Sequence, residues 1–206
     1  MLQFEEYFEP EKGPQAIADG AVFLQEFARS ESAFLIEEIR KVVAKAPFRE
    51  AYTKGGLRMS LTSTGCGAID WLDDEEGRIS SPALGPALRA FAVRAATAAG
   101  YPDFMPNACL INRYLPGAKL GLHQDREETD TDEPIVSVSL GLPITFLFGG
   151  LDRSDPTQRI ALDHGDVIVW GGASRMAFHG VLTLKDGQHP ILGRQRINLT
   201  FRKIKV

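Results

Sequence analysis

The end of the chain alternates strictly between polar and apolar residues. From Arg196 to Arg202 the even-numbered positions are polar and the odd-numbered ones are apolar. Successive side chains of a β-strand point to opposite faces, so this pattern predicts a strand with one polar and one apolar face. The polar face would consist of Arg196, Asn198, Thr200 and Arg202. An ordinary strand with one face in solvent would show the same alternation. Two arginines around an Asn and a Thr also suit a dicarboxylate, because guanidinium binds carboxylate through paired hydrogen bonds.

Short apolar runs, separated by Gly, Pro and Asp, fill the rest of the second half of the chain. We expect strands at Ala108–Tyr114, Leu120–His123, Ile135–Leu142, Thr145–Phe148, Arg159–Leu162, Val167–Trp170, Ala177–Leu182 and Gln195–Arg202. Many short strands with such turns predict a β-sandwich or a barrel. His164 and His189 fall in a turn and a loop between these runs, so a structural role is expected for both.

The first half of the chain predicts two helices. Ser30 or Ser32 could cap a helix that ends before Pro47 and whose apolar residues recur at helical spacing. A second helix is expected over 86–99, with Pro86 in its first turn and Gly100 after its end. Residues 1–20 should form an irregular arm, and Ala21–Phe27 a strand. The glycine-rich stretch 49–82 should be irregular.

Composition limits the class of protein. The 206 residues are 44% hydrophobic, enough for one substantial core, so a single domain over 1–206 is expected. The net charge of −4 gives no general attraction to nucleic acid. Cys66 and Cys109 imply no disulfide framework. With no long apolar run or leader, we expect a cytoplasmic protein that contacts no membrane.

The candidate metal ligands are His123, Asp125 and His179. On an extended chain, residues two apart project to the same side, so His123 and Asp125 can bind one ion. A His-x-Asp sequence alone is more often a turn or a packed histidine. With His179 as a third ligand, however, the set matches the two-histidine, one-carboxylate triad of non-haem Fe(II) oxygenases.

Several motifs in one order extend this picture. They are Asn112-Arg113-Tyr114, Pro116-Gly117, His123-Gln124-Asp125, Val136 to Gly141, His164-Gly165-Asp166, His179-Gly180 and the strand Arg196–Arg202. Together they resemble the AlkB family of Fe(II)- and 2-oxoglutarate-dependent dioxygenases, most clearly over about residues 97 to 203. The resemblance implies an α+β, mainly β fold. A double-stranded β-helix (jelly roll) would occupy 105–206, after an N-terminal part, 1–104, that holds two helices and a nucleotide-recognition lid at about 49–82.

The resemblance also implies site residues. His123, Asp125 and His179 would be the catalytic metal ligands for Fe(II), with 2-oxoglutarate and O2 as cosubstrates. Arg196 would bind the far carboxylate of 2-oxoglutarate and Arg202 the carboxylate next to the metal. The remaining cosubstrate positions are Asn112, Tyr114, Asn198, Leu120 and Ser137. The implied substrate contacts are Trp71, Glu127, Met59, Arg78, Arg126 and Arg153. Of these, Trp71 would stack on a flipped base, and Arg78 stands where the best-known members have tyrosine.

The implied reaction is oxidative demethylation of N-alkylated bases such as 1-methyladenine and 3-methylcytosine. It would release formaldehyde, succinate and CO2. The partner would be alkylated DNA, single- or double-stranded, with RNA as an alternative, and the enzyme would act as a monomer. The stretch 123–133 carries six acidic residues and one arginine, a net of 1 − 6 = −5; a cationic base at Glu127 would fit this charge. Two rivals remain: a 2-oxoglutarate-dependent hydroxylase of a small molecule or protein side chain, and a jelly-roll module that binds without catalysis.

Overall fold

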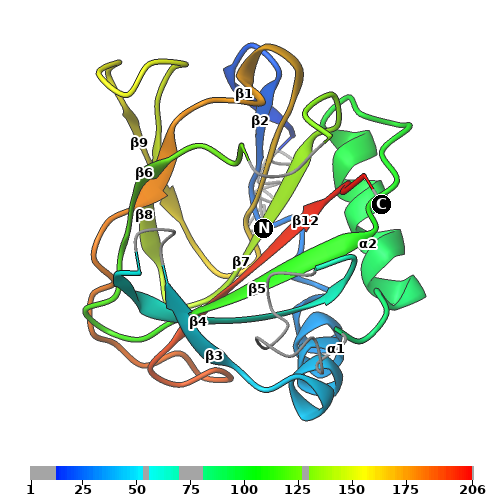
Figure 1. Cartoon of the computed structure of the whole chain (residues 1–206), viewed down its shortest axis with the longest axis vertical. Helices are drawn as coiled ribbons and strands as arrows, with labels where there is room; N and C mark the ends of the chain where they lie inside the picture. Colours follow the sequence, from blue (N-terminus) through cyan, green and yellow to red (C-terminus); the bar gives the residue numbers. More distant parts are fainter. Residues whose placement is uncertain (1–12, 53–55, 70–80, 127–129, 206) are drawn as a thin grey trace, which may run out of the picture.

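Two antiparallel β-sheets face one another in the computed structural model (Figure 1), which describes residues 13–52, 56–69, 81–126 and 130–205. The larger sheet has eight strands in the order β1-β2-β10-β7-β12-β5-β4-β3, and the smaller has four in the order β6-β11-β8-β9. The strands of the larger sheet are β1 (Gln15–Ala18), β2 (Ala21–Leu24), β3 (Arg49–Tyr52), β4 (Arg58–Gly67), β5 (Ala108–Tyr114), β7 (Ile135–Gly141), β10 (Val167–Trp170) and β12 (Arg196–Arg202). The smaller sheet is built from β6 (Leu120–His123), β8 (Ile144–Phe148), β9 (Gln158–Leu162) and β11 (His179–Val181). The predicted jelly roll is confirmed.

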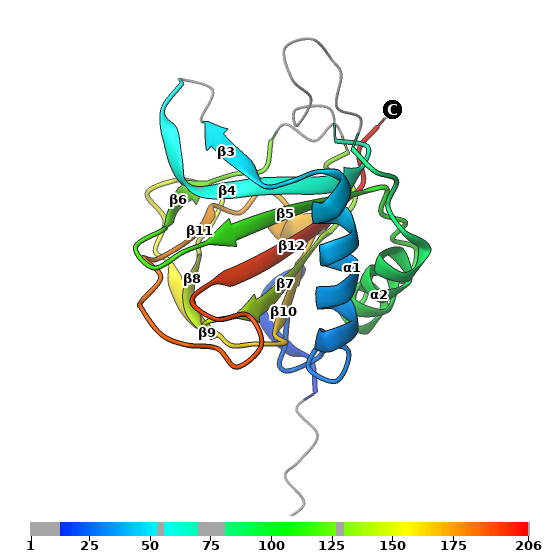
Figure 2. The same ribbon diagram turned by 90° about the horizontal axis from the view of Figure 1, so that it is seen from below.

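Both helices cover the outer face of the larger sheet (Figure 2). They are α1 (Ser32–Lys45) and α2 (Pro86–Ala98), with Pro86 in the first turn of α2 as predicted. The expected serine cap of α1 is wrong. Glu31 occupies the cap position without a side-chain hydrogen bond, and the Ser32 hydroxyl donates to Arg29 O. Among the described residues, neither helix combines the length and apolar character needed to cross a membrane.

The two faces of β12 lie in two different buried environments. Ile197, Leu199 and Phe201 pack with the helices in one core, whereas the even-numbered residues face the smaller sheet. All seven residues of β12 are buried. An ordinary half-solvated strand is therefore excluded. The alternation instead separates a hydrophobic core from a buried polar site.

Three strands of the structure were not predicted from the sequence pattern. Residues 15–18 form β1 rather than part of an irregular arm, and β3 and β4 occupy the start of the glycine-rich stretch 49–82. Strand β4 pairs along β5 from Thr62↔Arg113 to Gly67↔Ala108, so long-range hydrogen bonding outweighs the weak local preference of its glycines. The remaining predicted strands are confirmed within a few residues, although Ala21–Phe27 shortens to Ala21–Leu24.

Candidate active site

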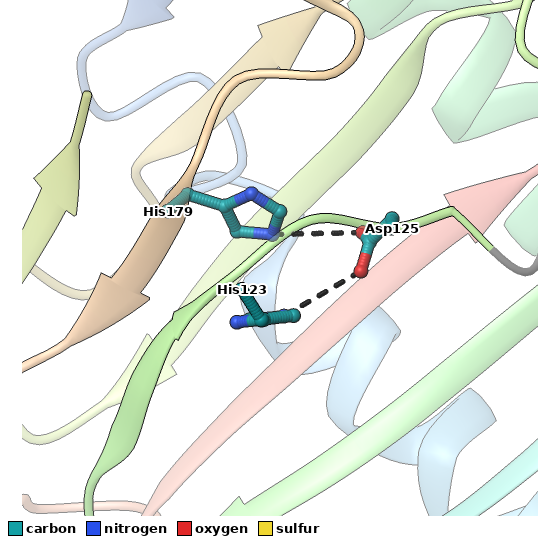
Figure 3. Close-up of side chains that lie close together, drawn as sticks. All are labelled: His123, Asp125 and His179. Carbon is teal, nitrogen blue, oxygen red and sulfur yellow. Dashed lines mark ion pairs between the residues drawn. The ribbon is translucent and has the colours of Figure 1, made fainter. Parts of the chain in front are cut away.

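His123, Asp125 and His179 meet at one end of the space between the sheets (Figure 3). His123 ends β6 and His179 begins β11, and the two residues are direct partners in the antiparallel pairing of these strands. Their Nε2 atoms lie 3.5 Å from Asp125 Oδ1 and 3.5 Å from Asp125 Oδ2, respectively. The three candidate ligand atoms all lie within 4.8 Å of one another. This is a donor set that can hold one divalent ion and leave its other positions open.

The hydrogen bonds of the two imidazoles indicate which nitrogen of each ring is free to bind a metal ion. His123 Nδ1 lies 3.0 Å from Gly121 O, and His179 Nδ1 lies 3.0 Å from Ala177 O. A carbonyl oxygen can only accept, so in the neutral ring the proton is on Nδ1 and the lone pair is on Nε2. The backbone thus orients both Nε2 lone pairs towards the position between them and Asp125.

The Asp125 carboxylate is buried yet strongly stabilised in its charged form. Burial opposes its ionisation, but the Arg202 guanidinium, with Nη2 2.8 Å from Oδ2, and the His179 ring hold the pKa of Asp125 well below its usual range. Burial also opposes protonation of His123, but the protonated ring can donate to Asp125 and is attracted by the carboxylate charge, and these effects raise the pKa of His123. The site is therefore arranged around a carboxylate anion.

One pocket contains the candidate ligands and every predicted cosubstrate residue. Its lining includes Asn112, Tyr114, Leu120, His123, Asp125, Ser137, His179, Arg196, Asn198 and Arg202. It also includes Phe146, Trp170, Gly180, Val181 and Thr200, which the sequence did not assign to the site. The residues come from both sheets, so the pocket exists only after the sheets have packed together.

Arg196 is the cation that best indicates which kind of ligand this pocket binds. Its side chain is buried, with Nη2 donating to Ser139 Oγ over 2.8 Å and its guanidinium 5.1 Å from the centre of the Tyr114 ring. Burial lowers the pKa of Arg196. Among the described residues, its Nε and Nη1 atoms find no hydrogen-bond partner. A buried cation with unused donors is costly unless an anion binds it, so the pocket is suited to a carboxylate ligand.

A hydrogen-bond network holds the other polar side chains. Asn198 Nδ2 donates to Ser137 Oγ over 2.9 Å and to Val138 O over 3.0 Å, while Thr200 Oγ1 donates to Asn198 Oδ1 over 3.1 Å. Ser63 Oγ, from β4, donates to Asn112 Oδ1 over 2.6 Å. These bonds fix the orientation of both amides before any ligand binds.

Aromatic side chains close the pocket beside His179. The Trp170 ring centre lies 4.9 Å from that of His179, and the Phe146 ring centre lies 6.1 Å from it. Trp170 is buried, and its Nε1 has no partner among the described residues. An apolar wall here limits access of water to the candidate metal ligands, which strengthens the electrostatic interactions among them.

The predicted substrate residues are more dispersed. Met59 is half-buried and lines a separate hollow on β3 and β4 with Leu61 and Leu115. Arg126 is exposed, and its Nε donates to Gln124 Oε1 over 2.6 Å. Arg153, also exposed, has its guanidinium 5.9 Å from the centre of the Phe178 ring, one residue before His179. Trp71, Arg78 and Glu127 lie outside the described residues.

Sequence reasoning missed several residues that hold the site together. Ser139 accepts a hydrogen bond from Arg196, and the alternation Val-Ser-Val-Ser over 136–139 was a usable signal, since it places Ser139 on the same face as Ser137. Thr200 was placed on the correct face but given no role. Trp170 and Phe146 lie in apolar strands whose sequences predict only packing in the hydrophobic core.

Comparisons with known proteins agree with this geometry. The profile of the 2OG-Fe(II) oxygenase superfamily matches residues 20–202. Alpha-ketoglutarate-dependent dioxygenase AlkB of Escherichia coli (strain K12) is 49% identical over 207 residues, 96% of this chain and 96% of that protein. The AlkB homolog of Caulobacter vibrioides (strain NA1000 / CB15N) is 38% identical over 83% of this chain and 81% of its own length. The solved structure of OsALKBH1 matches with a TM-score of 0.81 at 28% identity, over 92% of this chain and all (100%) of that one.

These likenesses span nearly the whole chain and include the segments that carry the triad and the buried arginines. Fe(II), 2-oxoglutarate and O2 are therefore its cofactor and cosubstrates. The chain belongs to the AlkB family of Fe(II)- and 2-oxoglutarate-dependent dioxygenases.

Proposed function

We propose that this dioxygenase removes alkyl groups from the bases of nucleic acid, with N-methylated bases of the 1-methyladenine and 3-methylcytosine type in DNA as its substrates. Family membership supports the reaction class. Two relatives that align with smaller parts of this chain have names that state a substrate. ALKBH1D of Arabidopsis thaliana is a DNA N(6)-methyladenine demethylase, and ALKBH1 of Homo sapiens is a nucleic acid dioxygenase. RNA is the alternative substrate that the same assay tests.

His123, Asp125 and His179 would hold the Fe(II). The neutral Nε2 lone pairs and the charged carboxylate oxygen are the ligands that this ion accepts. When bound, the iron supplies the oxidising power, using O2 and the electrons released as 2-oxoglutarate loses CO2 and becomes succinate. The protein orients the reactants and excludes water.

The observation that carries the cosubstrate assignment is the buried guanidinium of Arg196 with two unused donors, Nε and Nη1. A carboxylate bound there would fill them. Asn112 and Tyr114 lie opposite Asn198 and Arg196 in the β5–β12 pairing, so both can contribute to the same end of the ligand. Arg202, beside Asp125, would bind the carboxylate next to the metal. Asn198, Ser137 and Leu120 would line the remaining surface.

The proposed substrate contacts that the structure describes are residues outside the lining of this pocket. Trp71 would stack on the flipped base and Glu127 would accept from its exocyclic amine, which favours a cationic methylated base. Arg126 and Arg153 are exposed, which supports phosphate contacts from both, and Arg153 lies against Phe178, the neighbour of His179. Met59 and Arg78 would complete the substrate contacts. Hydroxylation of the N-methyl carbon gives a hemiaminal, whose collapse releases formaldehyde and the unmodified base.

The enzyme would act as a monomer in the cytoplasm. All three candidate metal ligands come from one chain, which supports a site complete without a second copy. Cys66 and Cys109 are free thiols although they are direct partners in the β4–β5 pairing, which fits a reducing compartment.

The deciding experiment follows methylated oligonucleotides by mass spectrometry during incubation with Fe(II), ascorbate and 2-oxoglutarate. We expect loss of the methyl group together with stoichiometric succinate and formaldehyde. DNA and RNA oligonucleotides carrying 1-methyladenine or 3-methylcytosine are compared with a neutral methylated base. Asp125→Ala should be inactive, whereas Asp186→Ala, which removes an exposed carboxylate bound by Arg194 and by Gly187 N–H, should keep full activity. Succinate formation without any demethylation would instead favour a small-molecule or protein hydroxylase.

A further inference from the structure

Arg175 is a buried arginine outside the pocket lining, four residues before His179 along the chain. It directly follows the 3-10 helix η1 (Gly172–Ser174), and its own N–H donates to Gly172 O over 3.0 Å. Ser174 Oγ donates to Asp19 O over 2.6 Å, which ties the same turn to the end of β1. The backbone that carries Arg175 is thus fixed from two directions.

The guanidinium of Arg175 joins two distant backbone carbonyls. Its Nη1 donates to Asp125 O over 3.1 Å, across 50 positions, and its Nε donates to Glu133 O over 2.9 Å, across 42 positions. The guanidinium is planar and rigid, so its two donors fix how far apart these carbonyls lie. One of the two carbonyls belongs to the metal ligand Asp125 itself.

Asp125 is consequently held at both ends by arginines. Arg202 binds its carboxylate over 2.8 Å, and Arg175 binds its backbone carbonyl. The neighbouring Gln124 is held by the same turn, because its Nε2 donates to Met176 O. Asp125 follows the last residue of β6 by two positions, so no strand pairing of its own sets its place.

We propose that Arg175 is a positioning residue that sets the place of Asp125 relative to His179 and thereby the affinity of the site for its metal. The proposal rests on the assignment of His123, Asp125 and His179 as the metal ligands. Arg175 and His179 belong to one short segment, so a bond from Arg175 to Asp125 relates two ligands from different parts of the chain. Groups that orient metal ligands from behind typically change metal affinity by about 10- to 100-fold when they are removed.

The sign of the effect separates positioning from simple electrostatics. Loss of a cation near the site should strengthen binding of a divalent cation if charge alone mattered. Loss of a positioning bond should weaken it. A purely structural role would lower the melting temperature but leave the metal affinity of the folded protein unchanged.

The experiment titrates Mn(II) into the full-length protein under anaerobic conditions and measures free ion by electron paramagnetic resonance. We expect Arg175→Met to raise the Mn(II) dissociation constant by about 10-fold or more, with faster amide hydrogen exchange at Asp125 and Glu133. Arg175→Lys should recover part of the affinity, because an ammonium group can still donate to one carbonyl. Arg113→Met is the matched control: Arg113 binds Thr62 and packs on Phe48 on the helix-facing side of the large sheet, so it should bind Mn(II) as the wild type does.

Wild-type affinity and wild-type exchange in a folded Arg175→Met would overturn the proposal, as would tighter Mn(II) binding. If Arg175→Met does not fold, Arg175→Lys decides, and an unchanged dissociation constant in that variant overturns the positioning role. Failure of the metal assignment looks different: the wild type would bind no Mn(II), or Asp125→Ala would bind it equally well.

Discussion

Arg202 Nη2 lies 2.8 Å from Asp125 Oδ2, although the two residues are 77 positions apart. This ion pair is buried and connects the last strand of the large sheet to the candidate metal ligand beyond β6. The last strand therefore supplies more than candidate cosubstrate contacts: it keeps the buried Asp125 carboxylate charged. The pairing has a direct consequence for how the site responds to pH.

Arg202→Met should raise the pKa of Asp125, because burial then opposes ionisation without the guanidinium to offset it. Metal binding needs the carboxylate, so protons should compete with Mn(II) at a higher pH than in the wild type. Measured from about pH 8 down to about pH 4, near the ordinary range of aspartate, the affinity of the variant should be lost first. Arg194→Met, which removes an exposed pair with Asp186, should follow the wild-type curve. Coincident curves for Arg202→Met would contradict this account.

Arg196→Met should weaken 2-oxoglutarate binding while leaving Mn(II) binding intact. Removing one member of a desolvated charge pair costs on the order of 2–5 kcal/mol, which corresponds to at least about a 30-fold higher dissociation constant. Calorimetric titration of 2-oxoglutarate into the Mn(II)-loaded protein measures it. Ser139→Ala should have a smaller effect in the same direction, about 0.5–1.5 kcal/mol, because it removes one neutral partner of Arg196.

Arg113→Met serves again as the control for Arg196→Met, since Arg113 is the partner of Ile197 in the β5–β12 pairing and faces the helices. Its 2-oxoglutarate titration should match the wild type. Equal titrations for Arg196→Met and Arg113→Met would mean that the polar face of β12 is structural only.

Trp71→Ala should reduce affinity for methylated oligonucleotides and slow demethylation, with 2-oxoglutarate binding unchanged. Stacking of a base on an aromatic ring contributes about 1–3 kcal/mol, so the loss of affinity should be about 5- to 150-fold. If Trp71 instead packed in the core, its removal would cost about 3–5 kcal/mol of folding stability. A large drop in melting temperature, with activity loss tracking unfolding, would assign Trp71 to the core.

Folding stability should fall in mildly acidic solution because of His164 and His189. Their rings are 4.4 Å apart; Gly141 N donates to His164 Nδ1 over 3.0 Å, and Leu192 N donates to His189 Nδ1 over 3.2 Å. Burial lowers the pKa of both rings; for His164 the neighbouring His189 and Arg29 lower it further. The unfolded state then binds more protons, so stability is complete above the unfolded pKa of about 6.5 and declines as pH falls below it.

Urea unfolding at a series of pH values checks this expectation. His164→Asn removes one titrating group and should flatten the decline between about pH 7 and about pH 5. Lys185→Met, at an exposed position in the loop that carries His189, provides a control that should retain the wild-type slope. An identical slope in the His164 variant would exclude the contribution of that ring.

The sequence predicted the parts of the site that depend on local periodicity. Alternation placed Arg196, Asn198 and Arg202 on one face of β12, and the spacing of His123 and Asp125 placed two candidate ligands together. The family resemblance then assigned Asn112, Tyr114 and Ser137, all of which line the pocket. What alternation could not decide was whether the polar face met water or a second sheet, because that depends on the packing of distant strands.

The remaining features depend on partners that no local pattern encodes. Strand β4 is stabilised by pairing with β5, so the local preference of its glycines wrongly predicted an irregular segment. Arg175 could not be identified at all, because it binds backbone carbonyls 42 and 50 positions away, and every residue has a backbone carbonyl. The missing serine cap of α1 shows the same limit on a smaller scale.

The two-faced character of β12 has a consequence for how mutations accumulate in this chain. Inserting or deleting one residue at the start of the strand, with the strand pairing kept in place, would exchange its faces, sending Ile197, Leu199 and Phe201 into the polar pocket and the arginines into the helix-facing core. Such a shift should greatly lower folding stability, because it buries the two arginines without partners. Selection for a folded chain therefore also preserves the spacing of the arginines, whether or not the enzyme is in use.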